Sequence, residues 1–328
     1  QLSVGSIICC ADGGHAEKEA LGKNPMAVPR MWDEEPISLL AACPWQPWGR
    51  EPDGPEERAE VTLESGATYA GQWKGRLLHG YGILVRQNGQ QHIGCFMDGQ
   101  AHGFGVFVGT NGNTYNGQWE KDKAHGYGRY VHVDGSTFEG EWRQDEKTGW
   151  GIESFPDGAR YVGTFSNGSK HGAGSYTSSS GATFEGQFRD DRMDGDGVYR
   201  FVDGRVYSGQ WQAGRMQGSG TMTWQDGTTY EGGYRDDVKH GEGTIRWPDG
   251  HVYRGHWYNG QLHGSGVMID KGGNVSPREW HNGVEKDASA LRSRLRRISR
   301  TSHGRSNSRT RCFSPPCRGW RRPRKYSE

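Results

Sequence analysis

The sequence has few of the aliphatic residues that fill ordinary protein cores. Hydrophobic residues other than glycine occupy 32% of its 328 positions, and only with its 54 glycines does the chain approach the roughly 45–50% apolar share of a typical globular chain, which counts glycine. No apolar run approaches the ~20 residues that a membrane-spanning helix needs. We therefore expect neither a thick hydrophobic core nor a transmembrane helix.

Sequence motifs of catalysis and phosphate binding are also missing. The chain contains no Gly-x-Ser-x-Gly, His-Glu-x-x-His or kinase catalytic-loop pattern. Its many Gly-x-Gly pairs are not followed by Gly-Lys-Ser/Thr and open no helix pattern, so they do not indicate a phosphate-binding loop. We expect no catalytic residue and no bound cofactor.

Cysteine is sparse and irregularly spaced. The six cysteines do not predict a disulfide framework, which favours a reducing compartment inside the cell. Cys9 and Cys10 are candidates for palmitoylation, although unmodified cysteines are the favoured interpretation. Because the chain begins with Gln1, we interpret it as a fragment or a processed product.

Glycine and aromatic residues take the place of the missing aliphatics. The chain has 54 glycines and 11% aromatic residues, too many rings for a disordered chain. This composition favours a thin, repetitive β structure. Charge is uneven: residues 292–328 carry twelve Arg, one Lys and one Glu, or +12, so the net charge of +1 leaves 1 − 12 = −11 for the rest.

A motif of the form Tyr-x-Gly-x-Trp recurs every 23 residues without an insertion, and we call its first residue position n of a repeat. Position n+2 is glycine and n+4 is aromatic in all nine repeats, and glycine also stands at n+11, n+13 and n+20. The repeats begin at Tyr69, His92, Tyr115, Phe138, Tyr161, Phe184, Tyr207, Tyr230 and Tyr253. We expect the repeat structure to be carried by Tyr69, Gly71, Trp73, Tyr115, Gly117, Trp119, Trp142, Tyr161, Tyr207, Trp211, Tyr230, Tyr253 and Trp257.

Strand geometry explains this pattern. Alternate residues of a strand share a face, so rings at n and n+4 flank a glycine on one side while polar residues at n+1 and n+3 face the other. We expect the glycines at n+11 and n+13 to form a flat bed for neighbouring rings, because glycine lets another group approach the backbone. The Asp-Gly and Asn-Gly pairs at n+19 and n+20 predict tight turns.

Each repeat is therefore predicted to be a β-hairpin that pairs edge to edge with the next. The predicted fold class is all-β, an elongated single-layer antiparallel meander of nine or more stacked hairpins, about 85 Å long at ~4.8 Å per strand. We expect a disordered leader at 1–60, the array at 61–283 with a decayed tenth repeat as its cap, a short basic amphipathic helix at 284–300 and a disordered tail at 301–328.

The repeats resemble the MORN family, named for membrane occupation and recognition nexus, whose signature is Tyr-x-Gly-x-Trp followed by His-Gly-x-Gly. His92 departs from the leading aromatic residue, and Thr148, Asp194 and Gln217 replace the histidine of the second motif. The resemblance implies an association with membrane junctions, axonemal spokes or cortical assemblies, and homodimers in some members. The second motif stands at His79, His102, His125, His171, His240 and His263.

The periodic histidines do not predict a metal array. Equivalent residues of adjacent hairpins lie two strands apart, about 9–10 Å, whereas the ligand atoms of one zinc ion lie only ~3–4 Å from each other. We expect these histidines to make hydrogen bonds that fix the hairpin turn. Cys312 and Cys317 with His303 fall short of a four-ligand zinc site, so no metal is predicted.

The C-terminal segment is the candidate membrane contact. Residues 284–300 combine apolar residues at spacings of 3 and 4 with arginines, which is typical of a basic amphipathic helix at a membrane surface. Anionic lipid attracts such clusters at roughly 1 kcal/mol per basic residue. Ser299 is a candidate phosphosite whose added charge would loosen the contact. The predicted contact residues are Arg292, Arg294, Arg296, Arg297, Arg300, Arg321, Arg322, Arg324 and Lys325.

These patterns favour a non-enzymatic scaffold or adaptor that presents an extended β surface to protein partners. The tail would tether it to anionic phospholipid or to cytoskeletal structures, for which the MORN resemblance implies the axoneme as an example. Nucleic acid is not the expected partner, and RNA compared with anionic liposomes at physiological salt would test that alternative. The MORN resemblance implies a second alternative, a regulatory module of a larger enzyme, of phosphatidylinositol phosphate kinase type or with a SET domain, which the full open reading frame would reveal.

Overall fold

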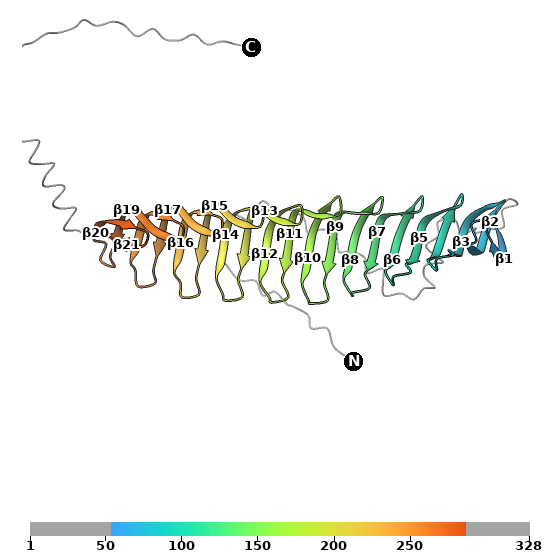
Figure 1. Ribbon diagram of the computed structural model, residues 1–328, viewed down its shortest axis with the longest axis horizontal. Helices are drawn as coiled ribbons and strands as arrows, with labels where there is room; N and C mark the ends of the chain where they lie inside the picture. Colours follow the sequence, from blue (N-terminus) through green and yellow to red (C-terminus); the bar gives the residue numbers. More distant parts are fainter. Residues whose placement is uncertain (1–53, 287–328) are drawn as a thin grey trace, which may run out of the picture. The chain divides into compact units, whose positions relative to one another are not determined.

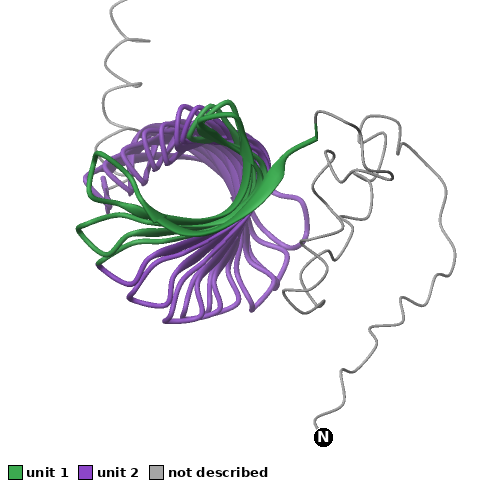
Figure 2. Cartoon of the chain, turned by 90° about the vertical axis from the view of Figure 1, so that its right-hand side faces the viewer, with its two compact units in different colours: residues 1–110, 116–123 green, residues 111–115, 124–328 purple. Residues whose placement is uncertain are grey.

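The computed structural model describes residues 54–286, which form antiparallel β-strands and no helix (Figure 1). These residues separate into two compact units, which Figure 2 shows in different colours. The described part of the first unit comprises residues 54–110 and 116–123, and that of the second comprises residues 111–115 and 124–286.

Each repeat contributes a strand of seven residues and a strand of nine, so the 23-residue period is one hairpin with its turns. The first unit holds β1 (Glu56–Thr62), β2 (Thr68–Lys74), β3 (Leu77–Val85), β4 (Gln91–Met97), β5 (Gln100–Val108) and most of β6 (Thr114–Glu120). The second unit holds most of β7 (Lys123–Val131), then β8 (Thr137–Arg143), β9 (Glu146–Ser154), β10 (Arg160–Ser166), β11 (Ser169–Thr177), β12 (Thr183–Arg189), β13 (Arg192–Arg200), β14 (Val206–Gln212), β15 (Arg215–Thr223), β16 (Thr229–Arg235), β17 (Val238–Arg246), β18 (Val252–Tyr258), β19 (Gln261–Ile269), β20 (Val275–His281) and β21 (Val284–Glu285).

Within each unit the strands pair with their neighbours in the sequence. In the second unit antiparallel pairs run without a crossover from β7 to β21. In the first unit β1 to β5 pair in the same way. The prediction of an all-β antiparallel meander of hairpins is therefore confirmed within both units.

The rings at positions n and n+4 form a buried ladder on one face of the sheet. Tyr207 makes edge-to-face contacts with Trp211 at 5.2 Å and with Tyr234 of the next repeat at 5.1 Å between ring centroids. The Tyr207 ring lies over Gly220 at position n+13, where an added Cβ would overlap the hydroxyl and the ring carbons. Of the residues predicted to carry the repeat, Gly71 and Trp119 are half-buried, and the buried ones are Tyr69, Trp73, Tyr115, Gly117, Trp142, Tyr161, Tyr207, Trp211, Tyr230, Tyr253 and Trp257.

The glycine at position n+11 does not belong to the bed under the rings, and this part of the prediction is wrong. In all nine repeats this glycine has a positive φ, between 54° and 107°, a conformation that favours glycine. An added Cβ at Gly218 would overlap the Gln210 side chain at n+3 instead of a ring. The cause is a β-bulge, visible as a register shift between Gly209 and Trp211, which leaves Gln210 at n+3 without a partner across β14 and β15.

Two hydrogen bonds close this bulge. Tyr207 donates its hydroxyl to the carbonyl oxygen of Gln210 at 3.0 Å, and the Gln210 Oε1 accepts the N–H of Ser219 at 2.9 Å. Burial, with a smaller contribution from Asp237, raises the pKa of Tyr207 to about 12, so its hydroxyl stays a donor at neutral pH. Buried backbone groups need partners, so the residues at n and n+3 stabilise the bulge together.

Two-residue turns at n+6 and n+7 join the strands of each repeat, and the sequence prediction did not include them. In eight of the nine repeats both residues have positive φ, as in Asp236 (49°) and Asp237 (68°), which is typical of type I′ hairpin turns. In the first repeat only Gly75, at n+6, has a positive φ. The Asp237 Oδ1 accepts the N–H of Met216 in the preceding repeat at 2.8 Å. Asp145 accepts the N–H of Ala124 in the same way at 2.7 Å. An aspartate at n+7 therefore ties one repeat to the repeat before it.

The ends of the array differ from the predicted boundaries. β1 begins at Glu56, although we expected the leader to extend to residue 60. The sequence did not predict this part of the strand, because it is exposed, highly charged and without apolar alternation. The predicted helix at 284–300 starts as the strand β21, because Val284 pairs with His281 of β20. The rest of that helix, the leader up to residue 53 and the tail at 301–328 lie outside the described residues.

Candidate functional site

His92 stands in the ring ladder of the first unit, at a position where the other repeats have Tyr or Phe. Its ring makes edge-to-face contacts with Phe96 at 5.0 Å and with Trp119 at 4.9 Å. His92 is 4% exposed, and burial lowers its pKa to about 4. The neutral imidazole therefore serves as an aromatic ring.

Nearby in β4, Cys95 is buried and disulfide-bonded, which the spacing of the cysteines did not predict.

Acid is expected to destabilise the protein through His92. Folding lowers the pKa of His92 from 6.5 to about 4, so the stability tied to its neutral form is present above pH 6.5 and is lost as the pH falls toward 4. A shift of this size corresponds to about 3 kcal/mol. We expect His92→Phe to remove this loss, as measured by urea unfolding midpoints at several pH values. Equal acid sensitivity of the variant would contradict this role.

In several repeats a side chain at position n+10 bonds the turn of the following repeat, which is the role that we expected for the periodic histidines. The Nδ1 of His263 accepts the N–H of Asn282 at 3.4 Å. Gln217, which replaces the histidine in its repeat, accepts the N–H of Asp236 through Oε1 at 3.0 Å. Asp194 also accepts a turn N–H, through Oδ2 at 3.0 Å. An acceptor at this position therefore bonds the turn in these repeats, and an imidazole is one of several that serve.

Replacing this acceptor in the seventh repeat is expected to have a modest and specific effect. Gln217→Ala should lower the free energy of unfolding by about 1 kcal/mol, the net value of a typical hydrogen bond. Gln217→His should change it by less than ~0.5 kcal/mol, because histidine accepts the same bond elsewhere. Urea denaturation measures both. A histidine variant as unstable as the alanine variant would show that glutamine is specifically needed.

Lysines at position n+9 place charges on the ring face, and the sequence prediction missed them. The Glu153 carboxylate contacts the Nζ of Lys147 and of Lys170, each at 2.5 Å. Burial acts to raise the pKa of Glu153, but the hydrogen bonds from both lysines outweigh it, so the pKa is lowered. Lys239 instead has three aromatic rings within 4.9 Å of its Nζ, and burial lowers its pKa. These contacts cover the charges, which indicates a structural role.

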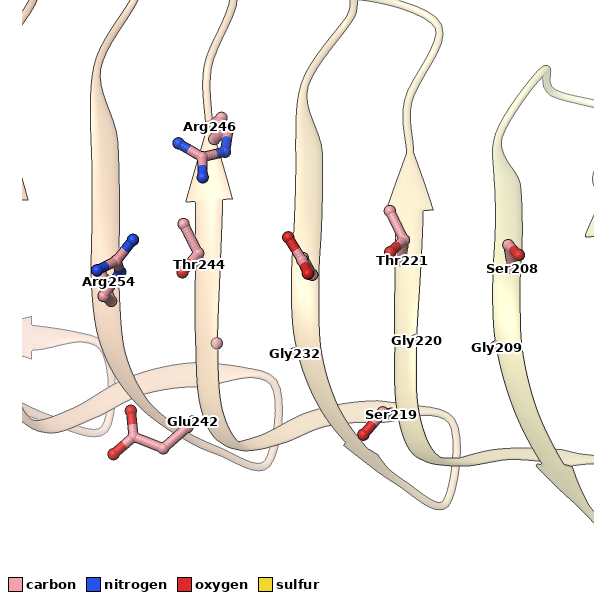
Figure 3. Close-up of a pocket in the computed structure, with 12 residues that line it drawn as sticks. Ser208, Gly209, Ser219, Gly220, Thr221, Gly232, Glu242, Thr244, Arg246 and Arg254 are labelled. Atoms are coloured by element: carbon pink, nitrogen blue, oxygen red, sulfur yellow. The ribbon is translucent and has the colours of Figure 1, made fainter. Parts of the chain in front are cut away.

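A groove of about 560 Å³ crosses the polar face of the second unit between β14 and β18 (Figure 3). Its floor is formed by the glycines at n+2 and n+13, which are Gly209, Gly220, Gly232 and Gly243. The side chains around it come from positions n+1, n+12, n+14 and n+16, which face away from the ring ladder. They are Ser208, Ser219, Thr221, Glu231, Glu242, Thr244, Arg246 and Arg254.

Two arginines give one end of this groove a positive charge. Neither Arg246 nor Arg254 forms an ion pair with another residue of the described part. Glu242 is paired with the Nε2 of His256 at 2.9 Å, and Thr244 lies directly across from Arg254 in the β17–β18 ladder. The groove can therefore bind a polar ligand through guanidinium and hydroxyl groups. The sequence prediction missed it because these positions vary between repeats.

The predicted tail contacts could not be placed. Cys9, Cys10, the candidate phosphosite Ser299 and all predicted membrane-contact residues from Arg292 to Lys325 lie outside the described residues. Within residues 54–286, no group of three or more His, Cys, Asp or Glu side chains could hold a metal ion. Nor do these residues form any helix long and apolar enough to cross a membrane.

Similarity to solved structures is low. The TCP10 domain of Danio rerio CPAP, in complex with a peptide of Danio rerio STIL, is 13% identical, with 70% of this chain and 98% of that chain covered and a TM-score of 0.35. The TCP domain of Drosophila melanogaster SAS-4 (dCPAP), in complex with a proline-rich motif of Ana2, is 12% identical, with coverages of 62% and 90% and a TM-score of 0.26. Virginiamycin B lyase from Staphylococcus aureus with quinupristin is 11% identical, with coverages of 70% and 71% and a TM-score of 0.14. Similarity at this level supports no inference about function.

The family comparison is decisive, although no curated protein matches the chain. Nine consecutive segments match the MORN repeat, and each begins at a predicted position n. They are residues 69–91, 92–114, 115–137, 138–160, 161–183, 184–204, 207–229, 230–252 and 253–275, more than half of the chain. The protein therefore belongs to the MORN-repeat family.

Proposed function

We propose that this protein is a repeat scaffold that binds protein partners along the polar face of its MORN array. The observation that carries the proposal is the difference between the ring face and the polar face of the sheet. The ring face is buried by packing between repeats, whereas the polar face carries an open groove between β14 and β18 whose side chains differ from repeat to repeat. Such a surface can select partners without changing the packing that stabilises the fold, and it requires no catalytic chemistry.

Site-specific photo-crosslinking tests this proposal. A photoreactive residue in place of Thr244 stands inside the groove, and one in place of the exposed Gln212 stands on β14 outside it. We expect a discrete partner protein to crosslink through position 244 and not through position 212. The double change Arg246→Glu and Arg254→Glu should abolish that product. Equal crosslinking at both positions, or none at position 244, would reject the groove as a partner surface.

We also propose that the basic tail tethers the scaffold to anionic membrane surfaces, where the protein associates with membrane or cytoskeletal structures. The charge of +12 in residues 292–328 supports this part of the proposal. Sedimentation with phosphatidylcholine vesicles, with and without phosphatidylserine, tests it. We expect binding only to the anionic vesicles, and loss of most of it when Arg292, Arg294, Arg296, Arg297 and Arg300 become Gln. Unchanged binding of this variant, or preferred binding to RNA at physiological salt, would contradict the tether.

A further inference from the structure

A second pocket, of about 360 Å³, lies on repeats eight and nine. It is formed by β17, β18 and β19 and shares no lining residue with the groove. Tyr258, 50% exposed, lies between two histidines at 5.4 Å from His240 and 5.5 Å from His263 between ring centroids. Gly264 and Ser265 also line this pocket.

In other repeats, a side chain of the protein itself fills the equivalent place. The Gln210 side chain lies where an added Cβ at Gly218 would be, and its Oε1 accepts the N–H of Ser219 at 2.9 Å. The Gln187 Oε1 accepts the N–H of Asp196 at 3.1 Å in the preceding repeat. In repeats one, four, six and seven, a side chain at n+3 with a terminal carbonyl or carboxylate oxygen therefore covers the glycine at n+11 and caps the N–H at n+12.

This internal side chain is missing in repeats eight and nine. Position n+3 of repeat eight is Gly233, and an added Cβ at Gly241 would meet no atom of the described residues within 4 Å. Position n+3 of repeat nine is His256, whose Nε2 contacts Glu242 at 2.9 Å. The atom nearest to an added Cβ at Gly264 is therefore the His256 Cβ, at 3.8 Å. The place that glutamine fills elsewhere is thus open.

Two polar groups that line this pocket have no side-chain partner among the described residues. Within residues 54–286, no side chain accepts the N–H of Ser265, the counterpart of the capped Ser219. The Nδ1 of His240 is buried and has no hydrogen-bond partner in the part of the chain that the structure describes. Unpaired polar groups in partly buried positions cost free energy and favour a ligand that pairs them.

We propose that this pocket binds the side chain of a glutamine or glutamate from a bound polypeptide. Its terminal oxygen accepts the N–H of Ser265 at n+12, just as the Gln210 Oε1 accepts the N–H of Ser219 in repeat seven. The rings of His240, Tyr258 and His263 contact the aliphatic part of the side chain. This binding site lies outside the groove and stands whether or not the groove binds a partner.

Histidine-detected NMR of the full chain tests this proposal. The probes are N-acetyl-glutamine-N-methylamide, the corresponding glutamate compound and the alanine compound as a negative control. We expect saturable shifts of the His240 and His263 resonances with the first two probes, with a Kd on the order of 1 mM, and none with alanine. A lower Kd for the glutamine compound would show that the pocket selects a neutral side chain, and a lower Kd for the glutamate compound would show that it selects an anionic one.

One substitution can fill the pocket from within. His256→Gln restores the glutamine of other repeats and should weaken probe binding at least tenfold. His251→Gln is the matched control, because the half-buried His251 is also a histidine paired with an acid, Asp249 at 2.9 Å, and it does not line the pocket. Unchanged shifts of the remaining histidines verify that both variants are folded. No saturable shift with either probe, or equal binding by His256→Gln and the wild type, would overturn the proposal.

Discussion

Gly220→Ala is expected to destabilise the second unit by about 3 kcal/mol, although it adds a single methyl group. The added Cβ would overlap the hydroxyl and ring carbons of Tyr207, which is 0% exposed and cannot move away from Trp211 and Tyr234. The backbone cannot retreat either, because Gly220 pairs with Gly209 across β14 and β15. Overpacking a well-packed core typically costs about 1–3 kcal/mol. Urea unfolding of the full chain measures the effect.

A second glycine separates this steric effect from backbone strain. Gly214 has a φ of 85°, and an added Cβ there would meet no atom within 4 Å. Gly214→Ala should therefore show the cost of the left-handed conformation alone, about 1 kcal/mol. Gly220 has no such conformation, so its larger loss would come from the ring. Equal losses in the two variants would contradict the packing of Tyr207 on Gly220.

Tyr207→Ala is expected to be the most destabilising truncation in the array, at about 4 kcal/mol. It removes a fully buried ring together with its edge-to-face contacts to two neighbours, and large aromatic truncations in cores cost about 3–5 kcal/mol. Tyr207→Phe should cost only about 1 kcal/mol, because it removes the hydrogen bond to the Gln210 carbonyl and keeps the ring. Denaturation of both variants separates the two contributions. An alanine variant no worse than the phenylalanine variant would refute the ring ladder.

The hairpin array could be predicted from the sequence because its determinants repeat. Rings at n and n+4 recur on one strand face in all nine repeats, and burial of Tyr207 and Trp211 follows from that spacing. The role of position n+10 was also predictable, because a polar residue beside a turn usually bonds its backbone. Gln217 shows that the hydrogen-bond acceptor is kept where the histidine is not.

The bulge could not be predicted from periodicity alone. The register shift between n+2 and n+4 places the glycines at n+11 and n+13 in different surroundings, although they stand two residues apart on one strand. Gly220 packs under a ring, whereas Gly218 packs under the Gln210 side chain. The two-residue turns did leave a signal, since Asp, Asn and Gly recur at n+6 and n+7, as in Asp236 and Asp237.

The two candidate binding sites were missed for a different reason. The groove depends on side chains at positions that vary between repeats, such as Thr244 and Arg254. The pocket on repeats eight and nine depends on what is absent at n+3, where Gly233 and His256 replace the usual capping residue. Such exceptions carry meaning only after the structure shows what the regular residue does.

A double-mutant cycle on Tyr207 and Gly220 tests most directly the packing on which this description of the fold rests. With the ring removed by Tyr207→Ala, the added methyl group of Gly220→Ala has nothing to overlap. It should then cost at most about 1 kcal/mol, which gives an interaction energy of at least ~2 kcal/mol between the two positions. Effects that add to within ~0.5 kcal/mol would mean that the ring at n does not rest on the glycine at n+13, and the explanation of the repeat would be wrong.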